Sequence, residues 1–529
     1  LLRKGLSMSA LIQTDVLILG AGIAGATTAL RLADRGVQVV IATRTEAPEE
    51  SNTYYAQGGI IYKGIEDSPA ALAQDILRAG AGHSYPPAVN QLSEEGPAAV
   101  EDILLNRAGV HFDRTADGAL SLAREGGHTL PRILHVADHT GKAIEMALIR
   151  ALLDHPNITL LTQHTAVDLL TPAHHAQDRL CVYEPLSCVG AYLYDQVSGQ
   201  VRRVMATETV LATGGLGQIF LRTSNPVGAR GDGVAMAWNA GARLINMEFI
   251  QFHPTTFHQE GAPNFLISEA VRGAGARLVN AAGEPFMQHY APEWKDLAPR
   301  DIVARSIHRE MFSKGLTHVH LDLRSYIAKA EIESHFPTIA ESCMQYGVDI
   351  TRDLVPVVPA AHYSCGGVWT DEWGRTTLRD LYAVGEVACT GLHGANRLAS
   401  TSLLEGLVWG IRAAEDILAA LPGRSRHAAE DIPPWQDAGL EIPDPALILQ
   451  DMSAIKHIMW NYVGLIRTTA RLNRALSELR HLEGEILHFY RRSKLTDELI
   501  GLRHAVHTAL IVAQAAWENK QSMGAHYRE

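Results

Sequence analysis

The sequence has few cysteines and no long apolar run. Its 529 residues include five cysteines, none with the spacing of a metal, haem or iron–sulfur motif: Cys181, Cys188, Cys343, Cys365 and Cys389. An odd number of cysteines suits a reducing compartment, so we expect a cytoplasmic protein. No stretch approaches the roughly 18 apolar residues of a membrane span. These absences argue against a disulfide scaffold, a built-in electron-carrier protein and a membrane-spanning protein.

Positive charge is also scarce. Lys and Arg number 46 against 58 Asp and Glu, which gives a formal net charge of -12 and disfavours non-specific nucleic-acid binding. Residues 1–9 contain Arg3 and Lys4 but no apolar core, so we expect no signal peptide and take Met8 as a candidate start. With 47% hydrophobic residues the chain is long enough for more than one globular domain.

The N-terminal part contains a complete βαβ pattern. An apolar strand at 15–19 leads into Gly20-Ala21-Gly22-Ile23-Ala24-Gly25, then a helix to Arg35 and a strand at 37–41. In this context G-x-G-x-x-G predicts a dinucleotide site. The acidic residue that usually ends the second strand is replaced by Thr43-Arg44, so we expect Thr43 at the ribose and Arg44 near a phosphate.

Two further strands run into glycine turns, at 209–215 and 381–385. Three such elements in separate parts of the chain predict one nucleotide domain that an insertion divides. We therefore predict an α/β fold with a Rossmann-like domain at 1–246 and 363–425, split by an α+β capping domain at 247–362. Leu-, Arg- and Glu-rich helical patterns predict a C-terminal helical bundle at 434–529. The polar stretch at 171–179 has no assigned role.

The loop from Gly385 to Ser402 combines several glycines with Arg397 and precedes a helical pattern. Backbone N–H groups and a helix N-terminus favour an anionic or electron-accepting group, and Arg397 can hold a carboxylate bidentately. Three other basic residues in the insertion or at its end, His253, Arg300 and His362, could join it around a small dianion, with Ser268 as a further donor. Each alone is more often structural. His253, His258 and Glu260 do not complete a metal-binding pattern.

Ten motifs together identify the family. The chain resembles the succinate dehydrogenase and fumarate reductase flavoproteins, and within them the branch that oxidises L-aspartate, over nearly its whole length. The motifs are GAGIAG at 20–25, SNTYYAQGG at 51–59, REGGH at 124–128, ATGG at 212–215, GDG at 231–233, HPT at 253–255, SEAVRGAG at 268–275, APRDIVAR at 298–305, AAHYSCGGV at 360–368 and GLHGANRLASTSLLEG at 391–406.

The resemblance implies one FAD per chain. Its contacts would include Gly20, Ala21, Gly22, Ile23, Gly25, Arg44, Thr53, Tyr54, Tyr55, Ala56, Gln57, Gly58, Gly59, Ile60, Asp232, Glu386, Ser402 and Leu403. Family members with covalent FAD carry a histidine at the position of Asn52. Because Asn52 has no nucleophilic ring nitrogen, we expect FAD to be bound non-covalently here.

The resemblance also implies a substrate pocket between the FAD-binding and capping domains. Substrate carboxylates would be held by His253, Ser268, His362, Tyr363 and Arg397. Arg300 would be the acid/base, with Glu269 and Arg272 as its proton relay, since an arginine with a pKa above ~12 needs one. Glu125 would pair with the ammonium of aspartate; the alternative is a surface pair of Arg124 and Glu125.

The implied reaction converts L-aspartate to iminoaspartate, with oxygen (giving hydrogen peroxide) or fumarate as the acceptor. This is the first step of de novo NAD biosynthesis through quinolinate, with quinolinate synthase as a candidate partner. Two alternatives stay open: a soluble fumarate reductase, which needs the same dianion-binding residues, and a non-enzymatic flavin-binding module whose helical C-terminus docks on a membrane partner.

Overall fold

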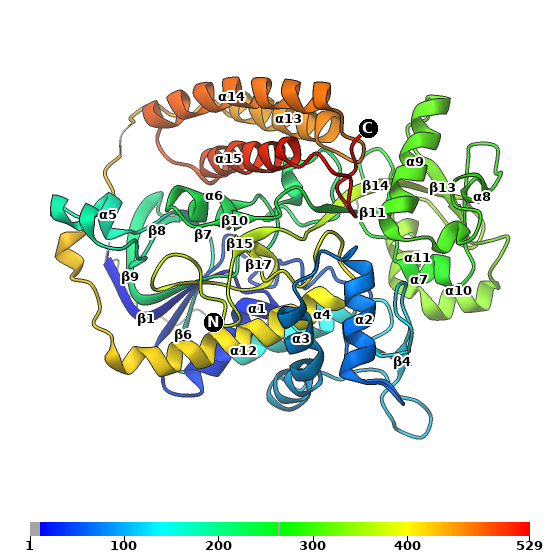
Figure 1. Cartoon of the computed structure of the whole chain (residues 1–529), viewed down its shortest axis with the longest axis horizontal. Helices are drawn as coiled ribbons and strands as arrows, with labels where there is room; N and C mark the ends of the chain where they lie inside the picture. The colour runs from blue at the N-terminus through cyan, green and yellow to red at the C-terminus, as the bar shows by residue number, and fades with distance from the viewer. Residues whose placement is uncertain (1–10, 263–264, 438) are drawn as a thin grey trace.

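A central seven-stranded sheet organises the molecule (Figure 1). The computed structural model describes residues 11–262, 265–437 and 439–529, so the expectations about residues 1–9, Met8 included, lie outside it. The strand order is β6-β2-β1-β9-β8-β7, and β16 also pairs with β9. The strands are β1 (Leu11–Leu19), β2 (Val39–Ala42), β6 (Ile158–Leu161), β7 (His164–Leu169), β8 (Gly190–Asp195), β9 (Gln200–Leu211) and β16 (Leu381–Ala383).

The predicted βαβ unit is confirmed. β1 leads through the glycine loop into α1 (Ile23–Ala33), and β2 pairs in parallel with β1. Gly20 has φ +113°, and a Cβ there would lie 2.1 Å from the carbonyl oxygen of Ala212. A Cβ on Gly25 would lie 2.2 Å from the carbonyl oxygen of Gly20. Side chains at these two positions would push the loop off the sheet, which is why both are glycine.

The three strand-to-glycine-turn elements meet in this sheet, as the sequence predicts. β9 lies between β1 and β16 and runs parallel to both. The turns at Gly20, Gly214 and Gly385 therefore open at the same edge of the sheet. In parallel α/β sheets ligands bind outside this carboxyl edge.

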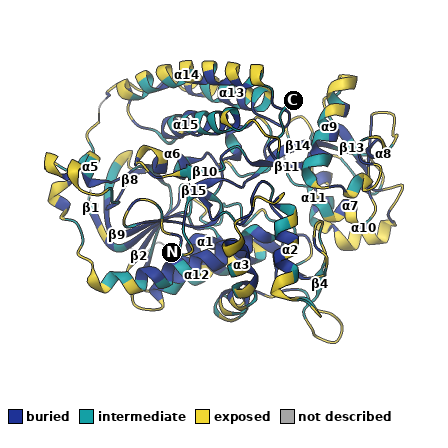
Figure 2. Ribbon diagram, in the orientation of Figure 1, coloured by how far each residue is buried: buried dark blue, intermediate teal, exposed yellow. Residues whose placement is uncertain are grey.

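Helices cover the lower side of the central sheet in the orientation of Figure 1. The long α12 (Thr401–Ala420) packs on α1, and Figure 2 shows the buried side of α12 toward the sheet. Others nearby are α2 (Pro69–Ala79), α3 (Pro86–Ala99), a π-helix that continues it (Val100–Arg107) and α4 (Thr140–Leu153). The smaller sheets contain β3 (Ile60–Ile61), β4 (Leu122–Ala123) and β5 (Ile133–Leu134), and β10 (Leu244–Ile245), β15 (Gly367–Trp369) and β17 (Ala388–Cys389).

The inserted segment forms an α+β unit, on the right in Figure 1. Its antiparallel sheet has the order β11-β14-β13-β12, and its own apolar core includes Phe257, Val303 and Val357. The elements are β11 (Ile250–Phe257), α7 (Glu269–Gly273), β12 (Arg277–Val279), α8 (Met287–Tyr290), α9 (Arg300–Lys314), β13 (Val319–Asp322), α10 (Lys329–His335), α11 (Pro337–Met344) and β14 (Val355–Ser364). The domain boundaries at 246/247 and 362/363 stay predictions.

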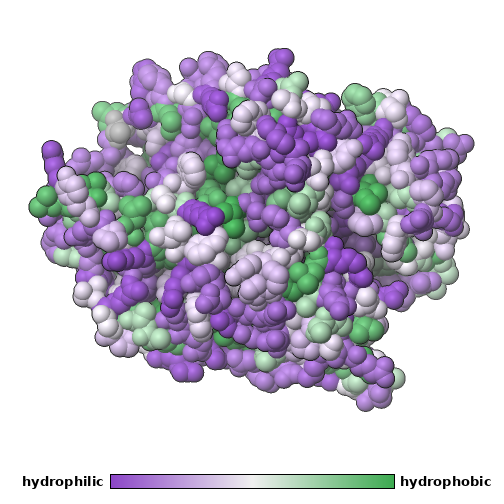
Figure 3. All heavy atoms as spheres, in the orientation of Figure 1, coloured by the Kyte–Doolittle hydropathy of each residue, from purple (hydrophilic) through white to green (hydrophobic). Residues whose placement is uncertain are grey.

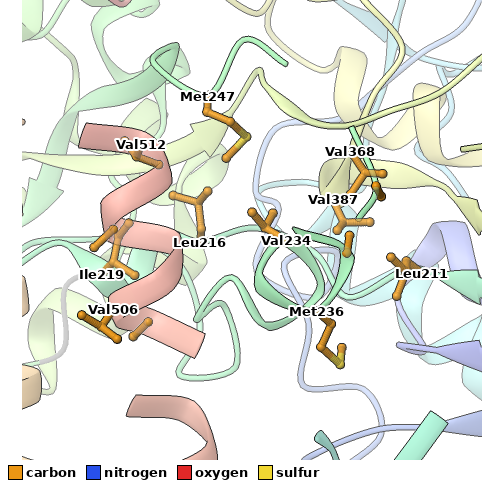
Figure 4. Close-up of a cluster of buried hydrophobic side chains, with 14 of the residues drawn as sticks. Leu211, Leu216, Ile219, Val234, Met236, Met247, Val368, Val387, Val506 and Val512 are labelled. Carbon is orange, nitrogen blue, oxygen red and sulfur yellow. The ribbon is translucent and has the colours of Figure 1, made fainter. Parts of the chain in front are cut away.

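Three long helices follow: α13 (Pro445–Tyr462), α14 (Thr469–Arg492) and α15 (Asp497–Glu518). The α15 helix lies on α6 (Asp232–Asn239), and Val506 and Val512 of α15 face Leu216 and Ile219 (Figure 4). By length and composition α15 could cross a membrane, which the sequence expectation did not foresee. However, 67% of its apolar window is buried against the rest of the protein, as in a core helix.

The polar stretch at 171–179 contains the short helix α5 (Pro172–His175) and begins a 3-10 helix at Arg179–Tyr183. Its tip exposes Leu180, Val182 and Tyr183. Elsewhere the face in Figure 3 is mainly hydrophilic, with small separate apolar areas.

Candidate functional site

One cavity extends from the glycine loop to the capping unit. All the predicted site residues line it except four: Gly25, Tyr54, Ile60 and Arg272. The loops after β1, β9 and β16 form one side, and β11, α7, α9 and β14 bring His253, Glu269, Arg300 and His362 to the other. The topology thus places the predicted nucleotide and dianion sites in a single space.

The four remaining residues lie behind the walls. Gly25 packs on Gly20 within α1. Ile60 is fully buried in β3, and the Tyr54 ring packs edge-on against Tyr55. Arg272 is 1% exposed and donates to the carbonyl oxygen of Asp296. These residues support the lining rather than form it.

The loop end of the cavity fits a dinucleotide. The cap position of α1 is Gly22, which has no side chain to cap the helix. The Ile23 amide donates to Oγ1 of Thr53 at 3.1 Å, and the following amides of the first turn can face a pyrophosphate. Several lining side chains have buried polar atoms without a hydrogen-bond partner among the described residues, including Nε of Arg44, Oε1 of Gln57 and Oγ1 of Thr213. Buried polar groups are normally hydrogen-bonded. A ligand rich in hydroxyl and phosphate oxygens would satisfy them.

The C-terminal helices contribute to this cleft, which the sequence did not indicate. Nη1 of Arg44 pairs with Asp497 of α15 at 2.7 Å, and Arg230 pairs with both Asp497 and Asp232. Burial opposes ionisation of Asp232, but the charges of Arg230 and His504 outweigh it and hold the pKa low. The sequence shows a recognisable helix cap at Thr496, but nothing near it indicates that the next residue, Asp497, pairs with Arg44.

Deeper in the cavity, Glu386 connects two loops. Its carboxylate accepts a hydrogen bond from Nδ2 of Asn52 at 2.7 Å and from the backbone N–H of Ser364 at 3.0 Å. Burial raises the pKa of Glu386 to about 7. Asn52 is therefore an orienting donor within the wall.

His253 on β11 and His362 on β14 lie side by side, with ring centroids 5.2 Å apart. Burial lowers the pKa of both histidines well below the usual range, and for each the Arg300 charge lowers it further. Both are thus neutral donors at pH 7 rather than cations. Nδ1 of His253 lies 3.2 Å from both the amide nitrogen and the carbonyl oxygen of Thr255, and its Nε2 is buried without a hydrogen-bond partner among the described residues. Nδ1 of His362 bonds the Ser224 hydroxyl at 2.7 Å.

Arg397 is 5% exposed and held from two sides. Nη2 donates to Oε1 of Gln251 at 3.1 Å, and the guanidinium lies 4.6 Å from the centroid of the Tyr363 ring. The Tyr363 hydroxyl bonds to Glu405 and His393, each at 3.1 Å, so Tyr363 presents its ring rather than its hydroxyl. Sequence reasoning missed Gln251, because a lone polar residue in a strand carries no signal.

Arg300 and Glu269 each begin a helix, α9 and α7, and meet across the cavity wall. Nε of Arg300 donates to Glu269 at 2.6 Å. Burial alone would raise the pKa of Glu269, but the Arg300 and Arg272 charges outweigh it and the pKa is lowered. Ser268 caps α7 by accepting from the amide of Ala270 at 3.3 Å. Arg300 and Glu269 of the predicted relay are thus in direct contact, whereas Arg272 acts on Glu269 through its charge and bonds to Asp296.

Glu125 faces the cavity instead of forming a surface pair with Arg124. Its carboxylate accepts from the Ser400 hydroxyl at 2.5 Å. A Cβ on Gly58 would lie 2.4 Å from Oε1 of Glu125, so glycine leaves the space that the carboxylate occupies. Within the described ranges no Lys or Arg forms an ion pair with Glu125. Its charge is therefore available to a ligand.

Comparisons with known proteins agree with this arrangement. Residues 15–403 match the FAD binding domain family, and residues 452–529 match the fumarate reductase flavoprotein C-terminal family. The L-aspartate oxidase 1 of Ralstonia nicotianae is 46% identical over 517 residues, which are 97% of this chain and 94% of the relative. An L-aspartate oxidase of Halobacterium salinarum is 44% identical over 516 residues, 97% and 96% of the two chains.

Solved structures with a similar fold belong to related flavoproteins. E. coli quinol fumarate reductase superposes with a TM-score of 0.88 at 27% identity, covering 98% of this chain and 91% of that chain. Mycobacterium smegmatis Sdh1 superposes with a TM-score of 0.81 at 30% identity, covering 98% and 89%. FAD is thus the cofactor for which the glycine-lined cleft is built. With relatives above 40% identity over almost its full length, the chain belongs to the L-aspartate oxidase family of FAD-dependent flavoproteins.

Proposed function

We propose that this chain oxidises L-aspartate to iminoaspartate with FAD, as the first step of de novo NAD biosynthesis. The observation that carries the proposal is the pairing, in one cavity, of a dianion-binding cluster with a free carboxylate. Arg397, His253 and His362 suit two substrate carboxylates, and Glu125 suits an ammonium. A succinate or fumarate site needs only the first set.

Each residue then has a defined task. Arg397 binds one carboxylate as a cation, while Nε2 of His253 donates a neutral hydrogen bond. Glu125 orients the ammonium and, with it, the Cα–H bond that is broken. Bound FAD would supply a two-electron acceptor for the hydride from Cα, and oxygen or fumarate would reoxidise it. Arg300 passes its own proton to Glu269 and can then take a proton from the carbon skeleton, with Arg272 as the next member of the proposed relay. Loss of the hydride from Cα and of a proton from the neighbouring carbon gives a C=C bond. A proton then moves from the ammonium nitrogen to that carbon and leaves protonated iminoaspartate, so the substrate loses one hydride and one proton in all.

Anaerobic mixing tests the substrate. The yellow protein should bleach on mixing with L-aspartate, because the flavin is reduced and no acceptor is present to reoxidise it. Succinate at the same concentration should bleach it far more slowly, since it offers no ammonium to Glu125. Fast bleaching by succinate without bleaching by aspartate would instead identify a succinate or fumarate enzyme.

Fumarate reduction is the second candidate activity. The similarity of the fold to quinol fumarate reductase supports fumarate reduction as the half-reaction that reoxidises the flavin. The same dianion-binding groups serve aspartate and fumarate, so fumarate fits as an acceptor for the reduced flavin. A flavin-binding module without catalysis is the third possibility. Peroxide release from purified protein and aspartate would eliminate it.

Non-covalent attachment of FAD is a separate prediction. Asn52 has no nucleophilic ring nitrogen, and its amide is already bonded to Glu386 at 2.7 Å. Acid precipitation should therefore release all the yellow colour into the supernatant. Asn52→Ala should behave in the same way but bind FAD more weakly, since Glu386 loses a donor. Colour retained on the acid pellet would contradict the prediction.

We further propose a quinolinate-forming partner and a cytoplasmic location. Iminoaspartate hydrolyses readily in water, so rapid transfer to quinolinate synthase would preserve it. All five cysteines are free, which suits a reducing compartment.

A further inference from the structure

The C-terminal segment, residues 523–529, follows α15 and ends beside the junction of β11, β14 and α9 (Figure 1). The backbone N–H of Ala525 donates to the carbonyl oxygen of Ala395 at 2.9 Å, two residues before Arg397. Met523 packs on an apolar cluster that contains Phe249, Tyr363 and Ala395. The segment therefore touches the strands that enter and leave the capping unit and the loop that carries Arg397.

Tyr527 connects this segment to the helix that begins with Arg300. The guanidinium groups of Arg305 and Arg309, both on α9, lie 4.9 and 5.6 Å from the centroid of the Tyr527 ring. Nη2 of Arg309 donates to the Tyr527 hydroxyl at 3.1 Å. Arg305 also pairs with Asp301 in the first turn of α9 at 2.7 Å. A chain of direct contacts thus runs from Tyr527 to the residue next to Arg300.

The other side of the segment is anchored in the C-terminal helices. Arg467 is fully buried and exchanges backbone hydrogen bonds with Tyr527 and Glu529 at 3.1 and 2.9 Å. Nη1 of Arg467 donates to Nδ1 of His526 at 2.5 Å, so the His526 proton is on Nε2, which donates to the carbonyl oxygen of Asn519 at 3.1 Å. Burial lowers the pKa of His526 to about 3, with a smaller contribution from Arg467. The anchor therefore keeps its protonation state across the physiological range.

We propose that residues 523–529 form a strap that sets the distance between Arg300 and Arg397, with Tyr527 as a positioning residue for the reaction. Arg300 belongs to the capping unit and Arg397 to the FAD-binding part, and the strap contacts both of these units while it is anchored at Arg467 of the C-terminal helical part. The inference rests on the proposed roles of Arg300 and Arg397. A small displacement of such a group costs catalysis more than it costs folding.

Tyr527→Ala in the full-length FAD-loaded protein tests the strap. The ring that supports α9 is removed, so kcat/KM for aspartate should fall by about tenfold to a hundredfold. FAD content should stay at the native level. Amide hydrogen exchange in the first turn of α9 should become faster. Tyr527→Phe keeps the ring and should recover most of the activity.

Lys520→Ala is the matched control, because Lys520 lies in the same tail but its ammonium contacts the ring and carbonyl oxygen of Trp517 in α15, not α9. It should behave as the native protein. Combining Tyr527→Ala with Arg305→Ala should cost less than the two separate losses together, since both remove one contact. Native-like kcat/KM and α9 exchange in Tyr527→Ala would overturn the strap, as would loss of activity only in proportion to lost FAD. The native protein is assayed in parallel. If it does not oxidise aspartate, the proposed function fails, and fumarate reduction then provides the readout for the strap.

Discussion

Arg300→Leu is expected to abolish nearly all aspartate oxidation while FAD stays bound. Removing a general acid/base lowers the rate by roughly 10²- to 10⁴-fold. The Arg300 side chain lies on the capping side of the cavity and pairs with Glu269 at 2.6 Å, away from the glycine loop. The flavin absorbance of the purified variant should therefore match the native protein, and the measurement is the rate of anaerobic flavin reduction at saturating aspartate.

Two further variants show why activity is lost in Arg300→Leu. Arg300→Lys keeps the positive charge beside Glu269 but not the guanidinium, so it separates electrostatic binding from proton transfer. Lys314→Ala removes an exposed cation at the other end of the same helix and should leave the rate unchanged. If Arg300→Leu is purified without flavin, the residue is structural. If it retains near-native turnover, the acid/base is a different group.

The second large effect concerns substrate choice. Glu125→Gln keeps the shape of the side chain and removes its charge, so the ammonium of aspartate loses its partner. Removing one member of a buried charged pair costs on the order of 2–5 kcal/mol. Glu125 is only partly buried, so we expect the lower end, about 30-fold in kcat/KM. Fumarate reduction should be kept or improved, since a negative charge has left the surroundings of a dianion.

The measurement is the ratio of the two kcat/KM values, native against variant. Ser400→Ala is a matched comparison: it removes the hydroxyl that donates to Glu125 at 2.5 Å but keeps the charge. It should lower aspartate oxidation less than Glu125→Gln does. An equal fall of aspartate oxidation and fumarate reduction in Glu125→Gln would show that Glu125 does not recognise the ammonium.

Local patterns were enough for the nucleotide end of the site. The order of strand, glycine loop and helix is visible in the sequence itself, and it predicts β1 and α1. Close packing of the backbone explains why positions 20 and 25 are glycine. The three strand-to-glycine turns predicted one nucleotide domain, and β1, β9 and β16 do pair in parallel within one sheet. Amino-acid motifs also gave the family, because ten separated motifs occurring together are far more specific than any one of them.

The sequence by itself thus determined the fold class, the FAD cleft and the identity of most groups that line it. Only the tertiary structure decided the protonation states of these groups and which distant residues hold them in place. It made His253 and His362 neutral donors, because burial beside Arg300 disfavours a second positive charge. It also brought Asp497 to Arg44 and Tyr527 to α9, over 200 or more residues of chain. Such pairings depend on how separate units pack, and no short-range periodicity or spacing encodes them.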